Sequence, residues 1–226
     1  MPYFILYEMV VNGAIYLRKS FRSDSLSITY FRLWTDDYTI ELMNFTLNCL
    51  AREAAGKEST PSLCCVDSQS VKLAPMINEE RGLDANKKIN GRKRQVLTDT
   101  TGLIWAVFIH AANKHDSIMG CELLERIQGY FSRLEKILID AGYKGTFANK
   151  AKEEYGIETE VGSRPPSEKG FIPVKWRWTI ERTFGWTNFY RRLVKDYERT
   201  TKSTESMLLL ANCTIALNII SSVSIN

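Results

Sequence analysis

The chain has 226 residues, of which 44% are hydrophobic and 25% charged. It is therefore long enough for one full-sized domain with a small appendage, and too short for two ordinary catalytic domains. The composition excludes disordered and fibrous proteins. The net charge of +4 is too small to indicate a nucleic-acid partner by itself, so any such partner has to be argued from local charge.

The cysteines and the chain's first residues bear on its compartment. The five cysteines lack the paired spacing of metal ligands, and Cys64 and Cys65 lie inside an apolar run, so we expect reduced, partly buried thiols. Residues 1–11 are apolar but contain Glu8, and they have no basic lead-in or cleavage site. We expect no membrane-spanning stretch after them. The sequence predicts a cytoplasmic protein that does not associate with membranes.

The predicted elements alternate between helices and strands. Apolar spacing predicts a small helical region over 1–58 and a main domain over 59–226, with a Gly-, Ser- and Pro-containing linker at 56–62. Thr101 and Gly102 predict a tight turn between two strands. This order predicts an α/β fold with a mixed sheet flanked by helices. Strands are expected at 63–68, 94–100, 103–111, 136–142 and 157–162, and helices at 117–133, 146–155 and 174–195.

Two aspartates follow apolar runs in matching contexts, Asp67 in VDSQS and Asp140 in LIDAGYKG. Because ligands collect at the carboxyl ends of strands in open α/β sheets, we expect both carboxylates to converge on one site. The alternative is that each aspartate only caps the loop that follows it.

Glu181 on the predicted helix 174–195 is the third candidate. At about 100° per residue it shares a narrow stripe with basic residues, among them Arg177 and Arg192. The alternative is an ordinary i, i+4 surface pair between Arg177 and Glu181. Aromatic neighbours indicate that this helix packs closely into the domain, which favours a role in the site.

Three carboxylates are the donors that Mg²⁺ or Mn²⁺ prefers, and His110 and His115 are the only imidazoles in the chain. Two such ions about 4 Å apart can activate an attacking hydroxyl and stabilise the leaving oxygen in a displacement at phosphorus. We therefore expect Asp67, Asp140 and Glu181 to bind two metal ions and to be the catalytic acids. Zinc-dependent hydrolysis is not expected.

Basic charge is concentrated in residues 86–94, NKKINGRKR, which contain no acid. This cluster either contacts DNA phosphates or is a solvated loop. His115 and Asp116 either cap the next helix, with Asp116 or Ser117 as the N-cap, or support the acidic site. The residues expected to bind DNA are Lys87, Lys88, Arg92, Lys93, Arg94, Arg177, Arg191 and Arg192.

Six motifs occur in a characteristic order: VDSQSVK at 66–72, RGLDANKKINGRKR at 81–94, DTTG at 99–102, AANKHD at 111–116, LIDAGYKG at 138–145 and RWTIERTFGWTNFYRRLVKDYER at 177–199. In these motifs the chain from about 28 to 218 resembles bacterial insertion-sequence DDE transposases, in particular the insertion sequence five group of the insertion sequence four type. The resemblance implies an RNase H-like fold. It places the family's two aspartates and its glutamate on Asp67, Asp140 and Glu181.

The same resemblance implies metal-dependent cleavage and transfer of DNA strands in the bacterial cytoplasm. The implied partners are terminal inverted repeats and target DNA, with a homodimer on DNA as the candidate assembly. The family's signature arginine falls on Arg177, whereas Val174 and Asn188 replace its tyrosine and lysine. Because the N-terminal region is shorter than in relatives, an inactive DNA-binding remnant stays an alternative, as does an RNase H-like nuclease that cuts without joining.

Overall fold

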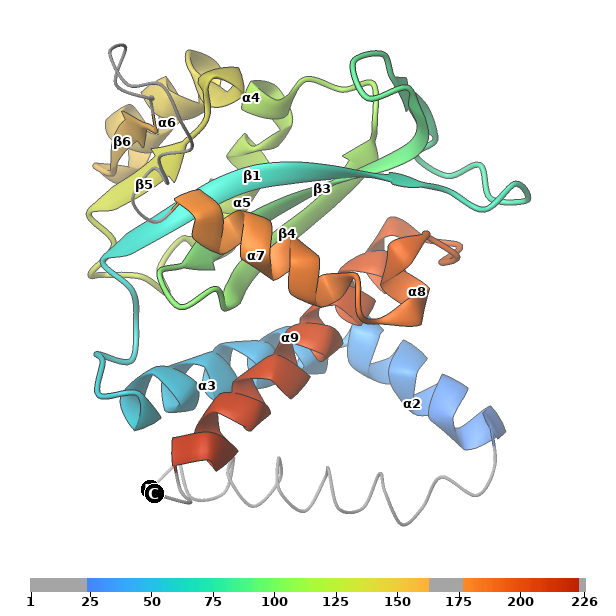
Figure 1. The fold of residues 1–226 in the computed structure, drawn as a ribbon, viewed down its shortest axis with the longest axis horizontal. Helices are drawn as coiled ribbons and strands as arrows, with labels where there is room; N and C mark the ends of the chain where they lie inside the picture. The colour runs from blue at the N-terminus through green and yellow to red at the C-terminus, as the bar shows by residue number, and fades with distance from the viewer. Residues whose placement is uncertain (1–23, 163–176, 224–226) are drawn as a thin grey trace, which may run out of the picture.

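The computed structural model describes residues 24–162 and 177–223, and the centre of the described chain is one six-stranded mixed sheet (Figure 1). The strand order is β2-β3-β1-β5-β6, and β4 also pairs with β3. The strands are β1 (Leu63–Lys72), β2 (Gly82–Asp84), β3 (Ile89–Asp99), β4 (Ile104–Ala111), β5 (Lys136–Ile139) and β6 (Glu158–Val161).

Strand directions divide this sheet into two parts. β3 runs antiparallel to β1, β2 and β4, whereas β5 runs parallel to β1 and β6 runs parallel to β5. Antiparallel strands thus lie on one side of β1 and the parallel strands β5 and β6 on the other. This arrangement is consistent with the expected RNase H-like fold. The turn at Thr101 and Gly102 joins β3 to β4 as predicted.

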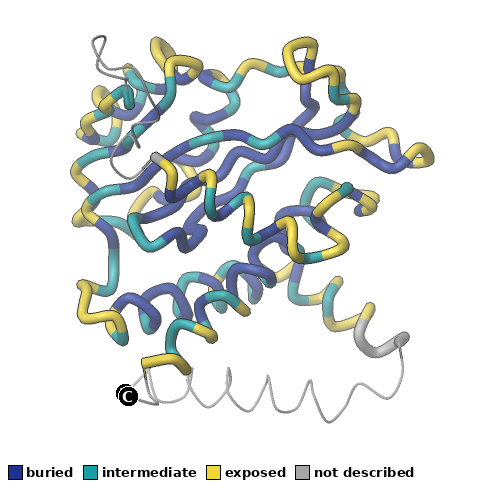
Figure 2. The backbone as a smooth tube through the Cα atoms, viewed as in Figure 1, coloured by how far each residue is buried: buried dark blue, intermediate teal, exposed yellow. Residues whose placement is uncertain are grey.

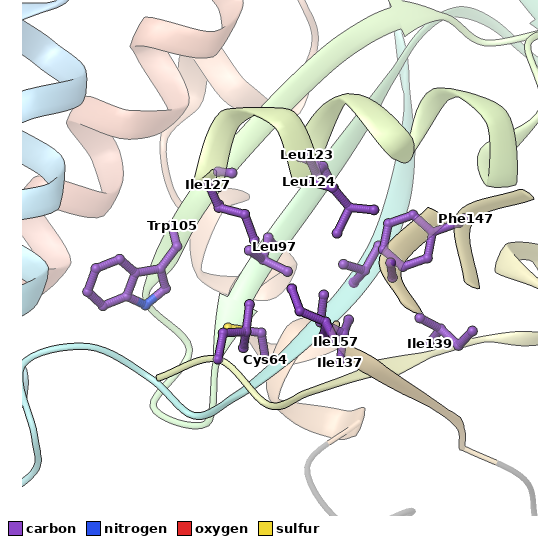
Figure 3. Packing of buried hydrophobic residues seen from close by; sticks show 14 of the residues in the cluster. Cys64, Leu97, Trp105, Leu123, Leu124, Ile127, Ile137, Ile139, Phe147 and Ile157 are labelled. Carbon is purple, nitrogen blue, oxygen red and sulfur yellow. The ribbon is translucent and has the colours of Figure 1, made fainter. Parts of the chain in front are cut away.

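The main hydrophobic core lies between one face of the sheet and helices α5 (Cys121–Ile127) and α6 (Thr146–Tyr155). Figure 3 shows Leu97 and Ile137 of the sheet packed against Leu124 and Phe147. These four side chains are fully buried. The short helix α4 (Asp116–Met119) precedes α5, and α7 (Arg177–Thr187) crosses the sheet on the side of β1 shown toward the viewer in Figure 1.

Helices α3 (Thr39–Ala54) and α9 (Thr201–Val223) pack on each other and on the edge strand β4. Asn44, Asn48 and Asn212 form a buried amide cluster around Ile104, the first residue of β4. The Asn212 side chain accepts a hydrogen bond from the Ile104 N–H at 2.8 Å, and Asn44 donates to the Ile104 carbonyl at 2.9 Å. Side chains thus satisfy backbone groups that an edge strand would otherwise leave unpaired.

The length and hydropathy of α9 are sufficient for a membrane span, so the expectation that no such stretch occurs is wrong. Length and hydropathy alone do not make α9 a membrane helix, because a core helix of a globular protein can have the same length and composition. Within the structure, Leu208, Asn212 and Ala216 of α9 are buried against the rest of the chain.

Several element boundaries differ from the sequence expectations. The helix expected over 117–133 is divided into α4 and α5 at Gly120, and the helix expected over 174–195 is divided into α7 and α8 (Arg191–Val194). Residues 174–176 lie outside the described residues. β2 and α9 were not predicted.

The N-terminal part of the described chain contains α2 (Asp24–Asp36) and α3, as its helical spacing predicts. The proposed division at residue 58 stays a prediction. The first 23 residues of the N-terminal region lie outside the described ranges. Helix α3 of this region packs directly on α9 and β4. All five cysteines are reduced and buried, which confirms the expectation for them.

Candidate active site

Asp67 and Asp140 occupy matching positions on neighbouring strands. In the parallel pairing of β1 with β5, Cys65 lies opposite Leu138, so two residues further along Asp67 corresponds to Asp140. Val66 and Ile139 both point into the main core. Because side chains alternate across a sheet, Asp67 and Asp140 project from the opposite face, the one on which α7 packs against β1.

Backbone N–H groups orient both carboxylates. Oδ1 of Asp67 accepts a hydrogen bond from the Ser68 N–H at 2.7 Å, and Oδ1 of Asp140 accepts one from the Gly142 N–H at 2.7 Å. The second bond begins the 3₁₀ turn η1 (Ala141–Tyr143). Both aspartates are half-buried. Asp140 therefore does cap the following turn, and this role is compatible with its position beside Asp67.

The pKa of the Tyr143 hydroxyl depends on the charges around the site. Burial raises the pKa of the Tyr143 hydroxyl well above its ordinary value, and the negative charges of Asp116, Asp67 and Asp140 raise it further. Both candidate metal ligands are therefore close enough to act electrostatically on the same buried phenol.

Glu181 is exposed on α7, and that helix is fastened to the β3–β4 turn beside it. Thr183 Oγ1 donates to the Gly102 carbonyl at 2.8 Å, and Arg182 Nη2 donates to the Thr101 carbonyl at 2.9 Å. The Arg182 guanidinium lies 4.4 and 4.6 Å from the ring centroids of Trp178 and Trp186. The expected close packing of this helix is confirmed.

The donor chemistry fits a hard divalent cation, because carboxylate oxygens are the ligands that such ions prefer. However, no group of three His, Cys, Asp or Glu side chains within 24–162 and 177–223 is arranged to hold a metal ion. The structure thus brings Asp67 and Asp140 to one face of the sheet but does not place Glu181 in a coordinating group with them.

Lys87 and Lys88 lie exposed in the turn between β2 and β3. This turn is fixed by Asp84, a residue that the sequence did not single out: Ser70 Oγ on β1 donates to its Oδ2 at 2.5 Å, and its Oδ1 accepts from the Lys87 N–H at 3.0 Å. Lys87 Nζ lies 3.5 Å from the Ser68 carbonyl oxygen, next to Asp67. The first half of the basic cluster is therefore both exposed and adjacent to the acidic site.

The second half of the cluster is buried, contrary to the expectation of one exposed patch. Arg92 is fully buried and bonds to Asp196 and to the Glu198 carbonyl. Arg94 is 1% exposed and donates to the Leu193 carbonyl at 2.8 Å, while burial lowers its pKa to about 10. Lys93 is 8% exposed and pairs with Asp116 at 3.1 Å. Arg92 and Arg94 thus tie β3 to α8 and to its connection to α9, and Lys93 ties β3 to the start of α4.

Arg191 and Arg192 are exposed on α8, and Arg192 pairs with Glu198 at 2.6 Å. The side chain of Arg177 lies outside the described residues. Neither Asp116 nor Ser117 is the N-cap of α4: His115 has this role, and its Nδ1 accepts from the Ser117 N–H at 3.3 Å.

The comparisons with known proteins bear on the family of this chain. Two family models, both described as a transposase DDE domain, match residues 58–162 and 137–218. A Burkholderia cepacia protein assigned to insertion sequence element IS402 as its transposase is 30% identical over 135 residues. That match covers 57% of this chain and 64% of the relative, so the chain spans less than two thirds of the relative's length.

The chain belongs to the DDE transposases. Members of this family bind DNA and use divalent metal ions. The particular insertion-sequence group stays a prediction.

Proposed function

We propose that this chain is a DNA transposase that cuts DNA at insertion-sequence ends and joins the ends to target DNA. The observation that carries the proposal is the matching position of Asp67 and Asp140 on neighbouring parallel strands, on the face where α7 packs. The transposase family models that match this part of the chain support it.

In this proposal Asp67, Asp140 and Glu181 hold Mg²⁺ or Mn²⁺, with two ions expected. When bound, such ions supply charge neutralisation at the reacting phosphate. The Ser68 and Gly142 N–H groups keep the two aspartates oriented. Glu181 joins them when metal and DNA bind. It is suited to do so because it is exposed and directly precedes Arg182 and Thr183, which anchor α7 to the β3–β4 turn.

Terminal inverted repeats and target DNA are the proposed substrates. We expect the protein to act in the bacterial cytoplasm, as a homodimer on DNA. We assign phosphate contacts to the exposed cations Lys87, Lys88, Arg191 and Arg192, and we retain Arg177 from the sequence. Arg92, Lys93 and Arg94 are not assigned, because their side chains are buried within the chain.

The test is an in vitro reaction with DNA that carries the sequences flanking the gene. We expect the wild-type protein with Mg²⁺ or Mn²⁺ to cleave this DNA and transfer the ends to a second DNA. Asp67→Ala and Asp140→Ala should abolish both steps while DNA binding persists, because DNA affinity comes from separate cations. Cleavage without transfer would indicate the nuclease instead. Binding without cleavage by the wild type would indicate the inactive remnant.

A further inference from the structure

The turn that carries Asp140 is tied to the core through Tyr143. The Tyr143 N–H donates to the Asp140 carbonyl at 3.2 Å, closing the 3₁₀ turn. The Tyr143 ring is 1% exposed and packs edge-on against Phe147, with ring centroids 5.4 Å apart. A Cβ atom on Gly120 would lie 2.8 Å from Tyr143 Cε1, so the absence of a side chain at Gly120 leaves the room that the ring occupies.

The Tyr143 hydroxyl donates a short hydrogen bond to Oε1 of Gln95, a fully buried residue of β3. Gln95 lies opposite Ser68 in the β1–β3 pairing, and its neighbour Val96 lies opposite Asp67. The Tyr143 hydroxyl, which also has a side-chain hydrogen bond with Ser68, therefore links the Asp140 turn to the part of the sheet that carries Asp67.

Gln95 is itself held in one orientation. Its Nε2 donates to Asp116 Oδ1 at 2.8 Å and lies 3.1 Å from His110 Nε2. His110 Nδ1 lies 2.8 Å from the Ala111 carbonyl oxygen, which assigns the ring proton to Nδ1 and leaves Nε2 to accept from Gln95. Burial lowers the pKa of His110 and so favours this neutral form. Both amide hydrogens are used, and the amide oxygen faces Tyr143.

The ladder between β1 and β5 ends at Cys65 and Leu138, two residues before Asp67 and Asp140. Within the described residues, the paired positions of β1 and β5 therefore stop short of both aspartates. Two ligands of a shared ion must be placed within a few tenths of an ångström. A side-chain contact near both aspartates is suited to fix their separation.

We propose that Tyr143 and Gln95 are positioning residues for the metal site, and that their hydrogen bond sets the spacing between Asp67 and Asp140. The inference rests on the proposed function, because it assumes that these two carboxylates share metal. Neither Tyr143 nor Gln95 contacts metal or DNA in this account.

The test measures Mn²⁺ binding by the full chain in the absence of DNA, from the electron paramagnetic resonance signal of free Mn²⁺. Tyr143→Phe keeps the ring and removes only the hydroxyl. We expect it to weaken Mn²⁺ binding about tenfold, the size of effect found when partners of metal ligands are removed. The matched control is Tyr190→Phe, which removes a hydroxyl that donates to the Ala211 carbonyl at 3.3 Å on α9. This control should bind Mn²⁺ like the wild type at a comparable cost in thermal stability.

Gln95→Met removes the acceptor at similar side-chain volume. If Tyr143 and Gln95 act through their shared bond, their effects should not add. The double variant should then lose no more Mn²⁺ affinity than the single variant that binds Mn²⁺ more weakly. Unchanged affinity in folded Tyr143→Phe, or an equal loss in Tyr190→Phe, would overturn the inference while leaving the proposed function intact. A wild-type chain whose Mn²⁺ binding is absent, or insensitive to Asp67→Ala and Asp140→Ala, would overturn both.

Discussion

Gly102 illustrates how a single residue gives α7 its place on the sheet. Its φ is +91°, and an added Cβ would lie 3.0 Å from both Thr183 Oγ1 and Trp186 Cζ3. We expect Gly102→Ala to lower the free energy of unfolding by about 2–4 kcal/mol, from the positive φ and from the clash with α7 together. Urea denaturation measures this change.

Gly129 provides the control, because its φ is +79° and no atom lies within 4 Å of an added Cβ. Gly129→Ala should cost only the backbone part, about 1 kcal/mol. Equal losses of unfolding free energy in the two variants would show that the packing of α7 on the β3–β4 turn does not require a glycine at position 102.

The exposed lysines of the β2–β3 turn provide a test of DNA binding. Replacing Lys87 and Lys88 by Gln removes two cations from a turn beside Asp67. We expect weaker DNA affinity and a logarithmic salt dependence whose slope is shallower by about two, because two fewer phosphates are neutralised. Fluorescence anisotropy at several salt concentrations measures both quantities.

The comparison variant replaces Lys57 and Lys152, which are also exposed but lie away from this turn. It has the same net charge as the first variant and should retain the wild-type slope. If both double variants shift the slope equally, the effect comes from net charge and the assignment of the turn is wrong.

The basic motif also shows where sequence reasoning ends at this scale. Lys87 and Arg92 look alike in NKKINGRKR, yet one is exposed and the other fully buried. The difference comes from partners that are distant in sequence. Asp196 and Thr204, which bond to Arg92, are 104 and 112 residues away. No local pattern shows that a cation will be buried against such partners.

At the level of elements, α9 is held to the sheet by the amide cluster at Ile104. Asn212→Leu would remove the acceptor of the Ile104 N–H and the donor to the side-chain oxygens of Asn44 and Asn48. Since each unsatisfied buried group costs about 1–3 kcal/mol, we expect a loss of at least about 2–4 kcal/mol in the free energy of unfolding. Chemical denaturation followed by circular dichroism measures it.

Asn218→Leu on the exposed side of the same helix is the matched control and should change stability little. If the two variants were equally stable, α9 would not depend on its buried asparagine, and the packing of α9 on β4 would be called into question.

Elements with a local signal could be predicted, and those without one could not. The β3–β4 hairpin has strand residues on both sides of Thr101 and Gly102, so its turn is encoded where it forms. α9 is apolar on most of its surface and shows no single hydrophobic stripe, so its pattern does not distinguish it from other buried segments. β1 and β3 extend beyond their apolar runs because polar residues such as Ser70 and Arg92 have partners inside the fold. Figure 2 shows that much of the sheet is buried.

Across the whole molecule, the same distinction divides the candidate site. Asp67 and Asp140 could be found from sequence because each follows its own apolar run, although Asp67 lies within β1 and not after it. The bond between Tyr143 and Gln95 joins residues 48 positions apart and has no such signal. Glu181 was assigned to the site from its position on a helix stripe and from the resemblance to DDE transposases. In the described ranges it belongs to no group of side chains that could hold a metal ion.

Glu181 therefore provides the most direct test of the central claim that this chain is a DDE transposase. The measurement is metal-dependent cleavage of DNA bearing the insertion-sequence ends by Glu181→Ala, with Glu153→Ala on the exposed face of α6 as the matched control. We predict that cleavage falls by orders of magnitude in Glu181→Ala, while the protein stays folded and binds DNA, and that the control cleaves normally. Near-normal cleavage by folded Glu181→Ala would contradict the assignment of the third metal ligand and with it the proposed mechanism.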